Sequence, residues 1–306
     1  MKATRDFFGD YLVTLADKDA SIVVVNCDLG EATRTLKFKE KFPQRFIECG
    51  IAEANAISIA SGLSKNGLKP FVTSFGHFLT GKFLEVFQSI GLNDSNVTLV
   101  GTHSGLAIGK DGPTQMGLRD IALMRLLPNV SIYQPFNENQ TYKSMDDIVN
   151  KEGPKYLRLN RQSQEYFPYS EDFKFGEHSE ITSGNSLLIV TQGAPTIEAY
   201  SAVIEVSKNE SIGLVSVQSL PLNESKFLKL LKKYQKVLVI EDHYSIGGLG
   251  DVVSNIISQN NINILMKKLA VNDYGQAGNP EDLYKRYSLD LSGIKNEIMY
   301  FLSIEE

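Results

Sequence analysis

The chain has 306 residues, of which 42% are hydrophobic, with 31 basic and 36 acidic residues and a formal net charge of −5. A chain of this length buries roughly three-quarters of its unfolded surface, so we expect a globular protein of two domains. The slight acidity and the absence of a long basic run argue against nucleic-acid and membrane partners, and no apolar run is long enough to span a bilayer.

Cysteine and histidine are scarce in this sequence. Cys27 and Cys49 are too few for a disulfide framework, and the four histidines show no metal-ligand spacing. The N-terminal stretch from Met1 to Asp6 lacks the apolar core of a signal peptide. We therefore predict a cytoplasmic protein with no metal site of its own.

The first half of the chain, from Phe7 to Gly153, alternates stretches of helical periodicity with short β-branched runs. This order is typical of parallel strands joined by crossover helices and predicts an α/β fold with a doubly wound, mostly parallel sheet. The predicted strands are Ile22–Asn26, Arg45–Cys49, Pro70–Ser74, Asn96–Thr102, Val130–Gln134 and Tyr156–Asn160. The predicted helices are Thr4–Ala16, Glu53–Lys65, Phe78–Ser89, Asp120–Leu127 and Glu138–Lys151.

The alternation stops after Arg161, where a polar, aromatic-dotted segment containing Pro168 is typical of an interdomain linker. It then resumes, with strands predicted at Ser186–Thr191, Ile212–Gln218, Lys236–Glu241 and Ile262–Lys267. Helices are predicted between them at Thr196–Ser207, Glu224–Lys233 and Gly250–Gln259. The sequence therefore predicts two doubly wound domains, at residues 1–162 and 181–306, with a linker at residues 163–180.

Glu53 lies where a short apolar run ends at Gly50 and an amphipathic helix begins. A carboxylate at a helix start suits the positive end of the helix dipole, so a surface charge is the plain interpretation. The same position is also a strand-to-helix corner, where open α/β sheets bind their ligands.

Two later stretches favour the ligand site. Thr73–Phe83 is dense in aromatic residues, and Thr102–Gln115 places His103, Lys110 and Asp111 among glycines where a strand should end. A long polar loop at the carboxyl edge of a parallel sheet is usually functional. Each feature also has a structural interpretation, with the aromatics as core, the histidine as a hydrogen-bonded loop residue and the aspartate as a turn former.

A glycine-rich turn at Ser245–Asp251 follows a predicted strand and opens a helix, which is the setting of a dinucleotide-binding fingerprint. Its spacing does not match that fingerprint. A tight turn that lets the helix pack closely is therefore favoured over a phosphate site.

Four motifs in a fixed order carry a resemblance to a known family. They are Gly50-Ile51-Ala52-Glu53-Ala54-Asn55, Thr73-Ser74-Phe75, Thr102-His103-Ser104-Gly105 and Gly109-Lys110-Asp111-Gly112-Pro113-Thr114. Together they resemble the pyrimidine-binding domain of transketolases and of the related deoxyxylulose phosphate synthases. The remainder, through Gly248-Leu249-Gly250, resembles the C-terminal domain of that superfamily. The Gly-Asp-Gly motif of the diphosphate-binding domain does not occur, so the chain resembles the C-terminal subunit of a split transketolase.

The resemblance implies thiamine diphosphate as cofactor, with a divalent metal, magnesium or calcium, held by the partner subunit. Glu53 matches the catalytic glutamate that bonds the aminopyrimidine ring nitrogen and favours the imino tautomer, whose nitrogen removes the thiazolium proton. Phe78, with Phe75 nearby, matches the aromatic that stacks on the pyrimidine. Asp28 and Leu29 match the segment that supports the cofactor's bent conformation.

The resemblance also implies a site for a sugar phosphate. Arg5, His103 and Arg161 match contacts to the substrate phosphate, for which planar guanidinium forks are well suited, and His103 is also expected to be catalytic. Asp111 matches the carboxylate that reads a sugar hydroxyl. Gln115 is expected at the substrate, where transketolases usually have a histidine that assists the reacting carbonyl.

Two further departures from the family pattern are Ala32, which falls near a phosphate-binding serine, and Gly81, which replaces a third aromatic residue.

The activity implied is transfer of a two-carbon ketol unit from a ketose phosphate to an aldose in carbohydrate metabolism. The implied assembly is an α2β2 heterotetramer of the N-terminal subunit with a homodimer of this chain. Two alternatives stay open, namely the β subunit of an oxoacid dehydrogenase and a catalytically inert regulatory homologue.

Overall fold

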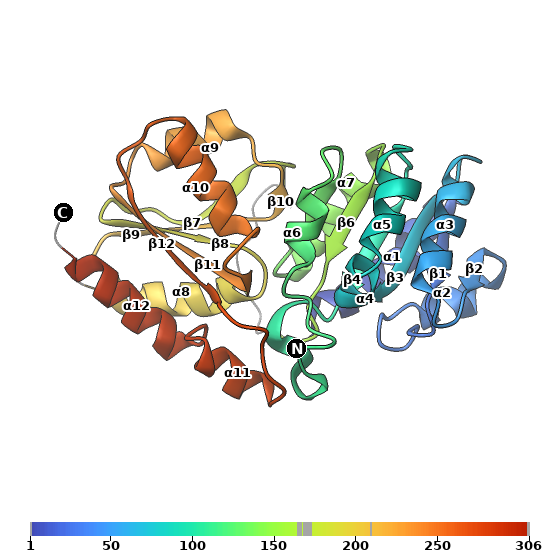
Figure 1. The fold of residues 1–306 in the computed structure, drawn as a ribbon, viewed down its shortest axis with the longest axis horizontal. Coiled ribbons are helices and arrows are strands. Elements are labelled where there is room, and N and C mark those ends of the chain that lie inside the picture. Colours follow the sequence, from blue (N-terminus) through green and yellow to red (C-terminus); the bar gives the residue numbers. More distant parts are fainter. Residues whose placement is uncertain (1, 164–166, 168–172, 209, 305–306) are drawn as a thin grey trace.

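The computed structural model describes residues 2–163, 167, 173–208 and 210–304. It contains two α/β units that lie side by side, each with a central sheet covered by helices (Figure 1). The predicted fold class is thereby confirmed. Much of the expected linker, including Pro168, lies outside the described residues.

The first sheet has the strand order β10-β5-β6-β4-β3-β1-β2. Six of its strands are parallel to their neighbours: β1 (Ile22–Asn26), β2 (Phe46–Glu48), β3 (Lys69–Phe75), β4 (Thr98–Thr102), β5 (Ser131–Tyr133) and β6 (Lys155–Arg158). The central strands β1 and β4 are buried along their whole length, as expected for a parallel sheet covered on both faces. Because these strands run the same way, their carboxyl ends meet at one edge of the sheet.

The helices of the first unit lie on both faces of this sheet (Figure 1). They are α1 (Thr4–Lys18), α2 (Leu36–Lys41), α3 (Glu53–Ser64), α4 (Gly76–Thr80), α5 (Phe83–Glu85), α6 (Asp120–Arg125) and α7 (Glu138–Asn150). Three further helical segments are not α-helices, namely η1 (Pro43–Arg45), η2 (Val86–Gly91) and η3 (Gly105–Asp111). The single helix predicted over Phe78–Ser89 is wrong. It is broken after Thr80, because the backbone of Lys82 is not helical, and it continues as a π-helix from Val86.

The second sheet has the order β12-β11-β8-β9-β7. Its strands are β7 (His178–Thr182), β8 (Leu187–Thr191), β9 (Ile212–Val217), β11 (Lys236–Tyr244) and β12 (Leu265–Val271), and its helices are α8 (Pro195–Val206), α9 (Glu224–Leu231), α10 (Leu249–Gln259), α11 (Pro280–Arg286) and α12 (Leu291–Ser303). Strand β7 pairs antiparallel with β9 and begins inside the range expected for the linker. Residues 178–180 therefore belong to the sheet.

The two units are joined by more than the chain between them. The short strand β10 (Ser219–Leu220) leaves the second unit and pairs antiparallel with β5 at the edge of the first sheet. One cluster of buried apolar side chains also extends through both units, with Leu127 and Ile132 from the first and Val217 and Phe227 from the second. The units consequently share part of their core.

Helices α11 and α12 were not predicted from the sequence. The second has a recognisable signal, since Asp290 caps it through the backbone N–H of Gly293 and apolar residues follow at Ile294, Ile298 and Phe301. None of the helices in the described ranges has the length and apolarity needed to cross a bilayer.

Candidate active site

A cavity of about 560 Å³ lies beside Glu53, at the carboxyl edge of the first sheet, and is called the Glu53 pocket below. Its lining residues come from the loop after β1, the start of α3, the β3–α4 corner and the loop after η3. They are Cys27, Asp28, Leu29, Ile51, Glu53, Phe75, His77, Phe78, Gly81, Lys82 and Gln115. The sequence-predicted cofactor residues are therefore brought together around one space.

Glu53 is the first residue of α3 and is only 7% exposed. The chain leaves β2 at Glu48 and turns at Gly50, whose φ of 68° lies in the left-handed region. Ser74 Oγ donates a hydrogen bond of 2.9 Å to Glu53 Oε1. No donor to Oε2 is found in the part of the chain that the structure describes, so this oxygen is available to a ligand in the pocket.

An aromatic wall faces the same pocket. The rings of Phe75 and Phe78 are stacked, with centroids 5.4 Å apart and an interplanar angle of 15°. Phe75 also contacts His103, with ring centroids 4.0 Å apart. Phe75 is 8% exposed and thus fixed by the core, and Phe78 is half-buried at the pocket surface. Two stacked rings beside a carboxylate can hold a planar heterocycle with a polar edge.

A second cavity, of about 510 Å³, adjoins the first and is called the arginine pocket below. It is lined by Arg5, Asp28, Leu29, Glu31, Ala32, Arg34, Phe75, His103, Asp111 and Arg161. Asp28, Leu29 and Phe75 line both cavities, so the two cavities are neighbours. The predicted substrate residues lie here, except Gln115, which lines the Glu53 pocket.

Arg5, in the first turn of α1, is held by two contacts. Its Nη1 donates to the carbonyl oxygen of Ala32 at 2.9 Å and to His103 Nε2 at 2.8 Å. Burial, and then the positive charge of Arg34, lower the pKa of Arg5 to about 10, so it stays charged at neutral pH. The buried Nε has no hydrogen-bond partner in the described protein and can donate to an anion.

The tautomer of His103 follows from its partners. A guanidinium can only donate, so His103 Nε2 must accept from Arg5, and Nδ1 carries the proton and donates to Thr102 Oγ1 at 2.9 Å. Burial, followed by the charges of Arg5, Arg161 and Arg34, lowers the pKa of His103 to about 3. Because both ring nitrogens are engaged, the geometry favours positioning of Arg5 over proton transfer.

We expect His103 to stay neutral throughout the pH range 5 to 8. Its pKa of about 3 in the folded chain lies below the ordinary value of 6.5, so its contribution to stability is present above pH 6.5 and is lost as the pH falls towards 3. Imidazole ¹⁵N shifts of the folded chain, assigned with His103→Gln, measure this directly. A titration midpoint near 6.5 would contradict the buried, arginine-paired geometry.

The loop that contains η3 carries Asp111 and Gln115 to the two pockets. Arg161 Nη1 donates to the carbonyl oxygen of Ile108 at 3.3 Å, and Gly278 N donates to Gly109 O at 3.4 Å. Both Asp111 and Arg161 have exposed side chains, which places them at the mouth of the arginine pocket. The loop is therefore supported by residues of both units.

A buried ion-pair network lies behind this loop. Arg158 Nε donates to Asp120 Oδ2 at 2.8 Å, and its Nη1 donates to Asp242 Oδ1 at 2.9 Å. Its Nη2 donates to the carbonyl oxygen of Gly117, at the end of the loop, at 2.8 Å. A Cβ on Gly105, which has a φ of 70°, would lie 1.9 Å from Asp242 Oδ2, so glycine is required there. Arg158 thus ties the loop to both units.

The glycine-rich turn before α10 has the structural role that the sequence favours. Glu241 is buried and accepts hydrogen bonds from Leu249 N at 2.7 Å and Gly250 N at 2.9 Å. A Cβ on Gly248 would lie 2.0 Å from Glu241 Oε2. The first N–H groups of the helix are consequently occupied by a side chain of the protein.

Some pocket residues were missed by the sequence analysis. Arg34 and Lys82 belong to no motif, and His77 lies within the aromatic stretch Thr73–Phe83. His77 has a detectable signal, since it follows Phe75 at a strand-to-helix corner, and its Nδ1 lies 3.0 Å from Met116 O. Among the described residues there is no group of three or more His, Cys, Asp or Glu that could hold a metal ion.

The chain is similar to known proteins over almost its whole length. The transketolase pyrimidine-binding domain family matches residues 1–165, and the transketolase C-terminal domain family matches residues 176–294. A solved structure described as a split gene transketolase, in an inactive beta4 tetramer, superposes with a TM-score of 0.88 and 31% identity, covering 100% of this chain and 99% of that chain.

Similar sequences include both separate subunits and longer enzymes. A putative transketolase C-terminal section from Methanocaldococcus jannaschii is 32% identical over 305 residues, covering 97% of this chain and 96% of that protein. One of the subunits of apulose-4-phosphate transketolase from Phocaeicola vulgatus is 30% identical over 308 residues, covering 99% and 98%. Transketolase from Homo sapiens is 31% identical over 303 residues, but 97% of this chain covers only 48% of that protein. The chain therefore belongs to the transketolase family, in which it corresponds to the C-terminal section of a split enzyme.

Proposed function

We propose that the chain is the C-terminal subunit of a thiamine-diphosphate-dependent transketolase, which transfers a two-carbon ketol unit from a ketose phosphate to an aldose acceptor. The observation that carries this proposal is the adjoining pair of cavities. The Glu53 pocket has a buried carboxylate and stacked rings, and the arginine pocket has cations suited to a phosphate.

The Glu53 pocket fits the pyrimidine end of the cofactor. Oε2 of Glu53 is open to a ring nitrogen, and Phe78 with Phe75 offers a stacking surface. Bound thiamine diphosphate would supply a nucleophilic thiazolium carbon. Glu53 would share a proton with the ring nitrogen of the cofactor, and Gln115, which lines the same pocket, would donate its amide N–H to the substrate carbonyl.

The arginine pocket would orient the sugar phosphate. Arg5 and Arg161 would bind the phosphate group, Asp111 would accept a hydrogen bond from a sugar hydroxyl, and His103 would hold Arg5 in place. Asp28 and Leu29, which line both pockets, would contact the cofactor where the two ligands meet.

A partner subunit would complete the site. The similar proteins from M. jannaschii and P. vulgatus are separate sections or subunits, and the chain spans about half the length of human transketolase. An N-terminal subunit would therefore hold the diphosphate and the divalent metal. The proposed active species is α2β2, built on a homodimer of this chain, and the two free cysteines suit a reducing cytoplasm.

The isolated chain should bind thiamine diphosphate weakly. It offers contacts to the pyrimidine, but the diphosphate binds together with a divalent metal, and the described residues include no group of three or more His, Cys, Asp or Glu that could hold one. Calorimetric titration of the folded chain, with and without magnesium, measures this. Tight, magnesium-dependent binding would contradict the division of the cofactor site between two subunits.

Reconstitution tests the function itself. The chain is co-expressed with a candidate N-terminal subunit, and the purified complex is supplied with cofactor, ketose phosphate donors and aldose acceptors. We expect transfer of two carbons by the complex and none by either subunit alone. Release of carbon dioxide from a 2-oxoacid would identify an oxoacid dehydrogenase instead, and a stable complex without turnover would identify an inert homologue. The pairing of a phosphate-binding cation at Arg5 with a hydroxyl-binding carboxylate at Asp111 favours the transketolase.

A further inference from the structure

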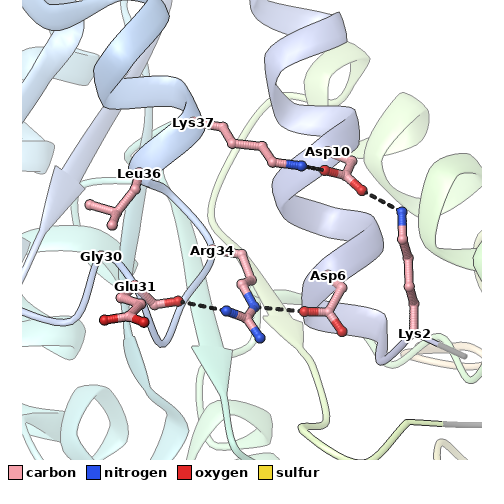
Figure 2. A pocket seen from close by; sticks show the side chains of 8 residues that line it. All are labelled: Lys2, Asp6, Asp10, Gly30, Glu31, Arg34, Leu36 and Lys37. Carbon is pink, nitrogen blue, oxygen red and sulfur yellow. Dashed lines mark hydrogen bonds and ion pairs between the residues drawn. The ribbon is translucent and has the colours of Figure 1, made fainter.

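Arg34 is exposed, and it forms part of the wall between two cavities. It lines the arginine pocket and also a cavity of about 340 Å³ beside α1, called the α1 pocket here, which Figure 2 shows. In the α1 pocket the charged side chains other than Glu31 pair with one another. Asp10 accepts from both Lys2 and Lys37, and Asp6 Oδ1 accepts from Arg34 Nε at 2.6 Å. The cations of the α1 pocket are thus paired with carboxylates, whereas Arg5 and Arg161 of the arginine pocket make no ion pair among the described residues.

Two features of α1 hold Arg34 in its position. Asp6 Oδ1 binds Arg34 Nε, while Asp6 Oδ2 accepts from the backbone N–H of Ala3 at 2.8 Å. Gly9, one turn further along, lets the backbone of Arg34 approach closely, since a Cβ there would lie 2.4 Å from the Arg34 carbonyl oxygen. Arg34 itself has a φ of 66°, a left-handed conformation that is uncommon for arginine. Strained residues of this kind persist where the surrounding structure determines them and are concentrated at ligand sites.

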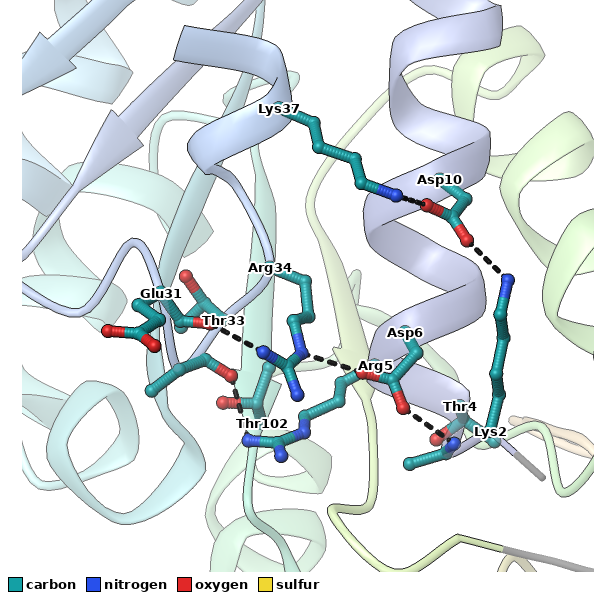
Figure 3. A network of polar contacts seen from close by, with 12 residues as sticks. Lys2, Thr4, Arg5, Asp6, Asp10, Glu31, Thr33, Arg34, Lys37 and Thr102 are labelled. Carbon is teal, nitrogen blue, oxygen red and sulfur yellow. Dashed lines mark hydrogen bonds and ion pairs between the residues drawn. The ribbon is translucent and has the colours of Figure 1, made fainter. Parts of the chain in front are cut away.

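The guanidinium of Arg34 keeps donors free. Nε is used by Asp6 and Nη1 makes a long contact of 3.4 Å to the carbonyl oxygen of Glu31. Within the residues that the structure describes, Nη2 has no hydrogen-bond partner. Figure 3 shows this guanidinium beside that of Arg5, with the unbonded nitrogen on the Arg5 side. The charges of Arg34 and Arg5 interact, because after burial the charge of Arg34, like that of Arg161, lowers the pKa of Arg5.

We propose that Arg34 is a third anion-binding side chain of the arginine pocket, which binds the terminal phosphate of the sugar together with Arg5 and Arg161. This inference rests on the proposed function and deepens it, because it makes Arg34 a determinant of the preference for phosphorylated over unphosphorylated sugars. The arginine pocket also contains the carboxylates Asp28, Glu31 and Asp111. Without Arg34, the cations Arg5 and Arg161 would leave the pocket at a net negative charge, so the third guanidinium makes it more favourable for a phosphate dianion.

The test compares ribose 5-phosphate with ribose, first as ligands of the full chain by calorimetry and then as acceptors for the reconstituted complex. Arg34→Gln keeps a polar, unbranched side chain, although a shorter one, and removes the charge. We expect its affinity for ribose 5-phosphate to fall about tenfold, as for a lost charge-assisted hydrogen bond, with KM raised in parallel and kcat nearly unchanged. Binding of ribose should not change, and Arg34→Lys should recover part of the loss.

Two further variants separate binding from support of the fold. Lys37→Gln removes a cation of the α1 pocket that does not line the arginine pocket, and it should change ribose 5-phosphate affinity by less than about twofold. Asp6→Asn removes the ion pair but keeps Arg34, so its loss should be smaller than that of Arg34→Gln. The inference is overturned if Asp6→Asn and Arg34→Gln lose the same affinity for ribose 5-phosphate, or if Arg34→Gln loses as much affinity for ribose as for ribose 5-phosphate. It is also overturned if the parent chain shows no preference for the phosphorylated sugar.

The proposed role of Arg34 and the proposed function of the chain can fail separately. If the reconstituted complex transfers ketol units but Arg34→Gln leaves the preference for phosphate intact, the role of Arg34 is wrong and the proposed function stands. If ribose 5-phosphate binding depends on Arg34 but no ketose is turned over, the anion site stands and the proposed function is wrong.

Discussion

Replacing Glu53 by glutamine should reduce turnover by the reconstituted complex roughly 10²- to 10⁴-fold, about 3 to 5 kcal/mol of barrier. The amide has the size of the carboxylate, and its oxygen can still accept the hydrogen bond from Ser74. It cannot share a proton with a ring nitrogen of the cofactor. The fold and the binding of the partner subunit should therefore survive, and the proton-transfer function should be lost.

Steady-state rates for parent and Glu53→Gln complexes, at saturating cofactor and donor, measure this effect. Glu40→Gln is a matched control, because Glu40 is an exposed carboxylate on α2 that lines neither pocket. It should retain the parent rate. Thermal unfolding of all three chains checks that the loss of turnover in Glu53→Gln does not come from a damaged fold. If the Glu53→Gln complex has the parent turnover, Glu53 is only a charge at the start of a helix and has no catalytic role.

Replacing Arg158 by methionine should lower the free energy of unfolding by about 3 to 5 kcal/mol. Arg158, Asp120 and Asp242 are almost completely buried, so the change leaves two carboxylates without a counter-charge in the core. It also removes the donor to the Gly117 carbonyl oxygen that supports the active-site loop. Activity should consequently fall even at temperatures where the variant is folded.

Urea unfolding at a fixed protein concentration measures the stability of the variant. Arg286→Met is the control, because Arg286 lies 3.9 Å from Asp273 in an exposed pair and should change the stability by less than about 1 kcal/mol. Neutralising a carboxylate in Arg158→Met/Asp242→Asn should recover part of the loss. An Arg158→Met chain as stable as the Arg286→Met chain would show that the buried network contributes little.

The sequence predicts those parts of the site that are encoded locally. Glu53 follows a glycine turn at a strand end, and Asp111 lies in a glycine-rich loop, so both could be placed at the carboxyl edge of the sheet from their neighbours in sequence. The chain order of strand and helix was sufficient to predict two α/β units, which the structure confirms.

Other parts depend on pairings between distant residues, which leave no local pattern. Arg34 is brought to the arginine pocket by Asp6, 28 residues earlier, and Arg158 joins Asp242, 84 residues later. Strand β10 joins the first sheet through only two residues, which pair with β5. Side chains and strands of this kind become visible only when the tertiary structure places their partners beside them.

The most direct test of the account is the exchange rate of the proton on the thiazolium carbon of thiamine diphosphate, followed by NMR in the reconstituted complex. Because exchange requires no sugar, it reports on the Glu53 pocket separately from the arginine pocket. We expect fast proton exchange in the complex with the parent chain. In the Glu53→Gln complex the exchange rate should fall in parallel with turnover, by roughly 10²- to 10⁴-fold. Equal exchange rates in the two complexes would show that Glu53 does not act on the cofactor and would contradict the assignment of this pocket.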